Sequence, residues 1–115
     1  MMEGETRTFY IDKFKKKDCK LPVSNLNMVE IEITKERSER SPNDAFTFRM
    51  VSMIGISHNP YIDCDNGYIR QLRTSGGAEN CGIGKILMQL CLNEETIHNV
   101  ENRLRKNKAL TELNK

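Results

Sequence analysis

The stretch at residues 68–92, YIRQLRTSGGAENCGIGKILMQLCL, changes character twice, and it decides the fold class. Its first seven residues include the β-formers Tyr68, Ile69 and Leu72, and they predict a strand. Residues 75–84 are mostly small and include four glycines, which is typical of a loop. Apolar residues then recur at helical spacing and share one helix face: Ile83, Ile86, Leu87, Leu90 and Cys91. We therefore predict a strand, a glycine-rich loop and an amphipathic helix in direct succession.

Three further strands are predicted ahead of this stretch, over residues 5–14, 27–34 and 45–57. In the second, Val29, Ile31 and Ile33 alternate with Glu30, Glu32 and Thr34, so one face is apolar and the other is wet. The third is the most apolar, and we expect it to lie centrally in the sheet and to form a hairpin-like pair with residues 68–74. Residues 35–44 are predicted to form a loop.

A second helix is predicted after the first. Asn93 precedes Glu94 and Glu95, as an N-cap precedes acidic residues in a first turn. Apolar residues continue at helical spacing through Ile97, Val100 and Leu104, and the tail at 109–115 is expected to fray. Antiparallel strands followed by helices make an α+β fold.

Size and composition limit the class of protein. The chain has 115 residues and a mass of 13.3 kDa, which suits a single domain over residues 1–115. Apolar residues make up 37%, and the net charge is only +2, so disorder throughout is excluded. No apolar run approaches the ~20 residues that span a bilayer, so we expect no membrane partner. The near-balanced charge also argues against dedicated nucleic-acid binding.

The cysteines and the N-terminus bear on location. Cys19, Cys64, Cys81 and Cys91 show no CxxC spacing, so a zinc site is not predicted, and we interpret all four as free thiols of a reducing compartment. The first five residues carry two glutamates and lack the apolar stretch of a signal peptide. An intracellular, cytoplasmic protein is expected.

The glycine-rich loop carries the main functional hypothesis. A strand, a glycine-rich loop and a helix in succession suit phosphate binding, because the first N–H groups of a helix lack partners and its dipole favours an anion. A P-loop is excluded, since Glu79 stands where its first glycine is required and Ile86 where its hydroxyl is required. A dinucleotide fingerprint is excluded as well, because Leu87 replaces its third glycine.

Residues 68–92 resemble the acetyl-CoA-binding segment of the GNAT superfamily of N-acetyltransferases. That segment has an apolar strand, a loop of the form [QR]-x-x-G-x-[GA] and an amphipathic helix, and Asn80-Cys81-Gly82-Ile83-Gly84-Lys85 matches the second half of the pattern. The resemblance implies that backbone N–H groups around Gly82 to Lys85 hold the pyrophosphate. It also implies that Leu72, Arg73 and Thr74 hydrogen-bond the pantetheine arm.

The chain departs from the family pattern in three ways. Glu79 stands where the family has Gln or Arg, the stretch from Leu72 to Gly82 is longer than in the family, and no strand is predicted after the helix. We therefore expect a shortened GNAT-like domain that lacks the C-terminal half. The resemblance implies acetyl transfer from acetyl-CoA to an amine whose identity is unknown. The catalytic residues are unknown too. In the family, the Tyr that often acts as general acid follows the loop, whereas Tyr10, Tyr61 and Tyr68 all precede it.

A non-enzymatic interaction module is the alternative hypothesis. An incomplete sheet leaves an exposed edge that invites pairing, and a homodimer is then expected.

Other residues carry weaker functional hypotheses. The lysine run at 13–20 is read either as a phosphate or nucleic-acid contact or as a solvated face, and the solvated face is preferred. His58, and the pair Glu30 and Glu32, are considered as bases but are expected to be surface groups. Cys81 stands where a helix N-terminus lowers a thiol pKa, yet nucleophilic catalysis is not expected because no paired His is found.

Overall fold

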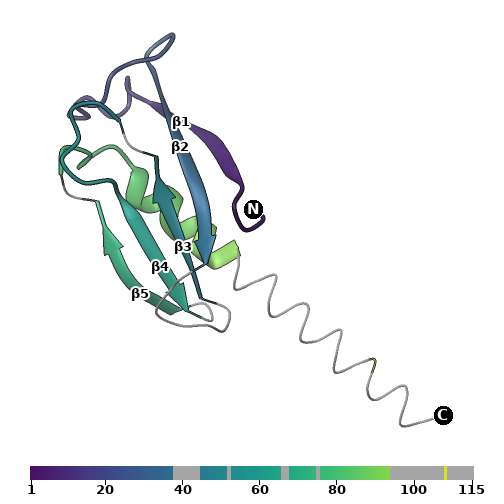
Figure 1. The fold of residues 1–115 in the computed structure, drawn as a ribbon. Coiled ribbons are helices and arrows are strands. Elements are labelled where there is room, and N and C mark those ends of the chain that lie inside the picture. The colour runs from purple at the N-terminus through teal and green to yellow at the C-terminus, as the bar shows by residue number, and fades with distance from the viewer. Residues whose placement is uncertain (38–44, 52, 66–67, 75, 94–107, 109–115) are drawn as a thin grey trace.

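The computed structural model describes residues 1–37, 45–51, 53–65, 68–74, 76–93 and 108. These residues form an α+β fold in which five antiparallel strands are followed by a helix that begins at residue 83 and runs to residue 93 of the described part (Figure 1). The strands are β1 (Thr6–Asp12), β2 (Met28–Arg37), β3 (Ala45–Met50), β4 (Tyr61–Asp65) and β5 (Tyr68–Arg73). Their order in the sheet is their order in the chain, so β3 is central, as predicted.

The core lies between one face of the sheet and the helix. Val29, Ile31 and Ile33 of β2 are fully buried on this face, whereas Glu30 and Glu32, which alternate with them, are exposed on the other. The core-facing helix residues Ile83, Leu87, Leu90 and Cys91 are buried in the same cluster. The two predicted periodicities, two for β2 and 3.6 for the helix, are therefore confirmed.

The third predicted strand was wrong in its second half. β3 ends at Met50, and most of the segment that follows is a connecting loop. Gly55 has a φ of 89°, a conformation that ends a regular ladder, and Ile54 is 99% exposed. The apolar residues of this segment did not indicate a buried strand.

The predicted hairpin between residues 45–57 and 68–74 was also wrong, because β4 lies between β3 and β5. β4 pairs with β3 through Phe48 and Ile62, and with β5 through Ile62 and Leu72. The strand is five residues long, and its inward side chains Ile62 and Cys64 alternate with outward acids. The second predicted helix and the tail at 109–115 lie outside the described residues, apart from Asn93 and Lys108.

The four cysteines are not free thiols, which corrects the prediction. Cys19 forms a disulfide with Cys81, and Cys64 of β4 forms one with Cys91 of the helix. The Cα atoms of the two pairs are 4.8 and 5.9 Å apart, within the range that a disulfide joins. Disulfides persist in oxidising compartments. The prediction of a cytoplasmic location rested in part on free thiols, and it loses that support.

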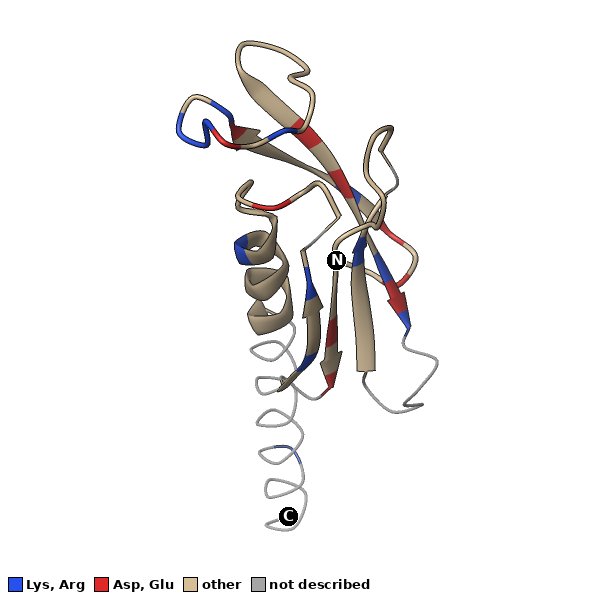
Figure 2. Cartoon of the chain, turned by 90° about the vertical axis from the view of Figure 1, so that its left-hand side faces the viewer, with Lys and Arg blue, Asp and Glu red and all other residues tan. Residues whose placement is uncertain are grey.

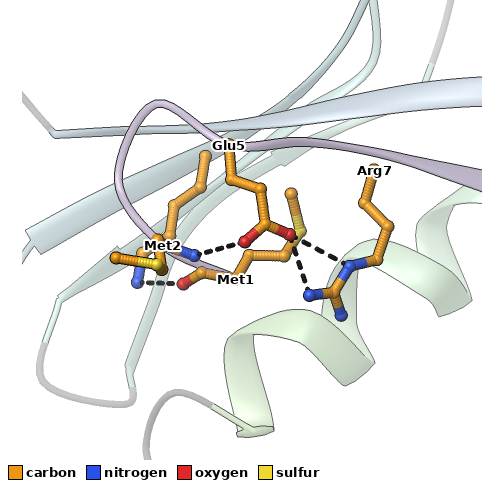
Figure 3. Close-up of polar contacts among 5 residues, drawn as sticks. Met1, Met2, Glu5 and Arg7 are labelled. Carbon is orange, nitrogen blue, oxygen red and sulfur yellow. Dashed lines mark hydrogen bonds and ion pairs between the residues drawn. The ribbon is translucent and has the colours of Figure 1, made fainter.

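A turn ahead of β1 fixes the N-terminus against the sheet (Figure 3). The Glu5 carboxylate accepts the Met2 N–H at 3.1 Å and the Arg7 guanidinium at 2.8 Å. These bonds, chiefly the one from Met2, hold the pKa of Glu5 below its ordinary value. The buried ammonium of Lys35 donates to the Met1 carbonyl at 3.0 Å and lies 4.0 Å from the centre of the Phe46 ring.

Candidate ligand-binding site at the start of the helix

Three connections gather at one end of the sheet. Because neighbouring strands are antiparallel, β1, β3 and β5 all end on the side where β2 and β4 begin. The connections at residues 13–27, 51–60 and 74–82 therefore share this end (Figure 1). The helix starts here, so the residues of the predicted ligand site are brought together at this end.

The first two glycines of the loop serve contact with the neighbouring loop. Gly76 and Gly77 have φ values of 99° and 106°. A Cβ on Gly76 would lie 2.9 Å from the His58 backbone nitrogen, which is too close for any other residue. The Gly76 carbonyl accepts the Ser57 N–H at 2.9 Å and the Ser57 hydroxyl at 3.2 Å. These contacts tie the glycine-rich loop to residues 51–60.

Glu79 folds back onto the glycine N–H groups. Its carboxylate accepts the Gly76 N–H at 3.0 Å and the Gly77 N–H at 3.1 Å. The N–H groups of Glu79 itself, of Gly76 and of Gly77 hold the pKa of this carboxyl below its ordinary value, and the Lys20 ammonium acts in the same direction. The residue that departs from the family pattern thus occupies two backbone donors with an anion of the chain's own.

Four further backbone donors remain at the start of the helix. The Ile86 N–H donates to the Gly82 carbonyl at 3.3 Å and makes the first hydrogen bond of the helix. The N–H groups of residues 82–85 consequently have no acceptor within the helix. Gly82 adopts a φ of 78°, and a Cβ there would lie 3.5 Å from Cε of Lys16. Lys16 and Lys85 are both exposed, so two cations accompany these donors.

The structure sorts the predicted site residues into two groups. The side chains of Cys81 and Ile83 are buried in the disulfide and the core, so only their backbone can face a ligand. Gly84 packs against β5, because a Cβ there would lie 3.1 Å from Cγ2 of Thr74. The accessible members lie at the end of β5 or at the start of the helix: Leu72, Arg73, Thr74, Asn80, Gly82 and Lys85.

The sequence did not associate the lysine run with this site. Cys19 lies within that run, and its disulfide to Cys81 holds Lys16 and Lys20 beside the loop that precedes the helix. The even number of cysteines was the signal for such a link, but four cysteines allow three pairings and the spacing selects none of them.

The weaker hypotheses fall elsewhere. His58 is exposed and contacts the glycine-rich loop through its backbone. Glu30 and Glu32 line a shallow pocket of about 230 Å³ with Val51 and Met53, on the sheet face away from the helix. Within the described residues no group of three metal-binding side chains gathers, and no helix is long and apolar enough to cross a bilayer.

Comparison with known proteins gives no match, whether with family models, curated proteins or solved structures.

Proposed function

We propose that the chain binds acetyl-CoA at the end of β5 and the start of the helix, as a shortened GNAT-like domain, and passes the acetyl group to an amine. One observation supports the proposal most directly. The N–H groups of residues 82–85 lack acceptors within the helix, and Lys16 and Lys85 stand beside them. Backbone donors, the helix dipole and two ammonium groups together suit a diphosphate.

The open edge of β5 supports the position of the pantetheine arm. β5 pairs with β4 on one side, and no strand among the described residues pairs with its other side. The ladder groups of such an edge can hydrogen-bond an amide-containing chain as they would a neighbouring strand. Thr74 follows this edge and lies against Gly84 at the start of the helix, so the sites for both parts of the ligand would be adjacent.

Acetyl transfer would then depend on positioning. A bound amine attacks the thioester carbonyl directly, the thiolate leaves, and the amine loses a proton. The protein would orient the thioester and stabilise its oxyanion through backbone N–H groups. The base that takes the proton is not assigned.

Titration calorimetry with acetyl-CoA and coenzyme A tests the proposal. We expect saturable binding that weakens about tenfold or more in the charge-reversal double variant Lys16→Glu, Lys85→Glu, because two attractive charges become repulsive. Arg37→Gln, an exposed site at the far end of β2, is the matched control and should bind as the wild type does. A folded wild type that gives no saturable heat would refute the assignment.

Glu79→Gln gives a second, opposite test. The substitution removes a negative charge near the proposed diphosphate site. It introduces glutamine, which the family pattern has at this position. We expect tighter coenzyme A binding than in the wild type. Unchanged or weaker binding would show that the diphosphate does not lie near the Gly76 and Gly77 N–H groups.

An interaction module remains the second candidate function, and the exposure of β5 favours it. Tyr68, Ile69 and Leu72 are 76%, 45% and 39% exposed on this strand. Exposed apolar side chains on an unpaired edge are typical of a surface that accepts another strand. Sedimentation at micromolar concentration tests it: a dimer without coenzyme A binding would favour the module, and a monomer that binds coenzyme A would favour the transferase.

A further inference from the structure

The connection between β1 and β2 exposes apolar side chains at its tip. The ladder between the two strands continues one step beyond them, because the Lys13 N–H donates to the Asn27 carbonyl at 2.8 Å. Phe14 and Leu26 follow this last pair on either side, and they are 72% and 87% exposed. Neither belongs to the core cluster. The fold therefore holds two large apolar side chains in water at the end of its longest hairpin.

Leu26 is also held in an unfavourable backbone conformation. The Met28 N–H donates to the Asn25 carbonyl at 2.7 Å, which closes a tight turn. The two central residues, Leu26 and Asn27, have φ values of 45° and 63°. Such a turn prefers Asn or Gly at both positions, and a leucine there is strained. Because the Leu26 side chain is exposed, burial does not offset this strain, and no contact in the fold explains why a leucine stands here.

Lysines flank Phe14 in the same connection. Residues 13–20 contain five lysines and one acid, Asp18. Figure 2 shows their positive charge gathered in the connection between β1 and β2. The Lys13 ammonium donates to the Leu21 carbonyl at 3.0 Å. The side chains of the other four lysines are exposed and make no ion pair or hydrogen bond to a described residue: Lys15, Lys16, Lys17 and Lys20.

The surrounding structure fixes this arrangement. Cys19 is bonded to Cys81, and Leu21 is buried, so both anchor the lysine loop to the body of the fold. The neighbouring loop at 51–60 lies at the same end of the sheet and carries Ile54, the most exposed large apolar side chain of the described residues. Apolar and cationic groups from two loops thus share one end of the molecule.

Two acids at this end accept backbone hydrogen bonds and keep their negative charge. The Asp12 carboxylate accepts the Phe14 N–H at 3.0 Å, and Glu79 is bonded to the glycine N–H groups. Asp18 is the acid within the lysine loop. Glu30 and Glu32 line a pocket with Val51 and Met53 of the loop that carries Ile54, so the cationic charge does not extend to that loop. The cationic and apolar surface is therefore the lysine loop with Phe14 and Leu26.

We propose that this end of the protein docks on the surface of an anionic phospholipid bilayer. Phe14 and Leu26 enter the boundary between headgroups and acyl chains, and the exposed lysines face the lipid phosphates and carboxylates. The docking is peripheral and needs no spanning helix. A nucleic acid would also attract the lysines, and Phe14 offers one ring on which a base could stack, but Leu26 and Ile54 are aliphatic and offer none, so the bilayer is favoured.

Co-sedimentation of the full chain with vesicles tests the proposal. One set of vesicles is phosphatidylcholine alone, and the other contains about one third phosphatidylserine, an anionic lipid. We expect about tenfold or stronger binding to the anionic vesicles, with the difference reduced by salt. Equal binding to both sets, or tighter binding to single-stranded DNA than to vesicles, would overturn the proposal.

Two variants and a control separate the contributions. The double variant Phe14→Ser, Leu26→Ser should lose about tenfold of the vesicle affinity, and Lys15→Gln, Lys17→Gln should lose a similar factor at low salt. The control Tyr68→Ser, Ile69→Ser removes two exposed apolar side chains at the opposite end of the sheet and should bind like the wild type. Undiminished binding by the Phe14 and Leu26 variant would refute apolar insertion. Its calorimetric affinity for coenzyme A should be unchanged, so failure of the membrane proposal is distinguishable from failure of the acetyl-CoA proposal.

Discussion

Breaking the Cys19–Cys81 disulfide should lower stability by a large fraction of the total. The two cysteines are 62 residues apart in the chain, and both are buried. Closing a loop of that length in the unfolded chain is worth about 4 kcal/mol by the chain-entropy relation, against a typical total of about 5–15 kcal/mol. Cys64 and Cys91, 27 residues apart, close a shorter loop that is worth about 3.5 kcal/mol. We therefore expect the doubly reduced chain to be marginally folded.

Urea unfolding with and without a reductant measures this effect. The double variant Cys19→Ala, Cys81→Ala should unfold at a urea concentration about 2–4 M lower than the wild type. Adding reductant to this variant should lower its midpoint further, because the second disulfide is then lost. Titration of the denatured, unreduced wild type with a thiol reagent should find no free thiol. Four titratable thiols, or a midpoint that the reductant leaves unchanged, would refute the pairing.

Three further predictions concern single side chains. Gly76→Ala should destabilise the fold by about 2 kcal/mol or more in urea unfolding, because its φ is 99° and the new Cβ would lie 2.9 Å from the His58 nitrogen. Leu87→Ala should cost about 2–5 kcal/mol in the same assay, since this side chain is fully buried between helix and sheet. Glu79→Gln should be less stable than the wild type at neutral pH. Because the folded-state pKa of Glu79 is lowered, its stabilisation is present above the unfolded-state pKa and is lost as the pH falls through the folded-state pKa. Urea unfolding at neutral and acidic pH should therefore find that the difference between this variant and the wild type shrinks with acid.

The fold class and the best-patterned elements were predictable from the sequence. Val29, Ile31 and Ile33 alternate strictly with polar residues, and the structure buries all three. Ile83, Leu87 and Leu90 keep a helical spacing, and they are buried too. In both cases one face of a regular element meets the core, so the period in the sequence reproduces the period of the backbone.

β4 was missed because its local sequence has the composition of a turn. Two of its five residues are aspartates, Pro60 precedes it, and Asn66-Gly67 follows it. Only Ile62 and Cys64 reach the core, which is too short a pattern to identify a strand. Pairing on both sides stabilises it, through Phe48 on β3 and Leu72 on β5. Tertiary pairing of this kind overrides local propensity and is not visible in the segment itself.

The backbone of the candidate site and Lys85 were predicted, but the contribution of the lysine run was not. The glycine-rich loop and the start of the helix are adjacent in the sequence, so their juxtaposition needed no knowledge of the fold. Lys16 and Lys20 are more than sixty residues away from Gly82 in the chain, and a disulfide brings them there. Glu79 was recognised as a departure from the family pattern, but only the structure gives it the Gly76 and Gly77 N–H groups as partners.

Both proposed binding activities depend on the Cys19–Cys81 disulfide, because it fixes the position of the lysine loop. Coenzyme A binding uses the N–H groups of residues 82–85 together with Lys16, whereas membrane docking uses Phe14, Leu26 and the exposed lysines. The two sets of atoms differ, but Cys19 holds the lysine loop to the residue directly before Gly82. Loss of this link frees the loop to sample other positions, so the lysines no longer present a fixed array to either anion. The Cys64–Cys91 disulfide still holds the helix to β4 when the first link alone is removed, so the backbone donors of the helix keep their place. The Cys19→Ala, Cys81→Ala variant should therefore lose more vesicle binding than coenzyme A binding.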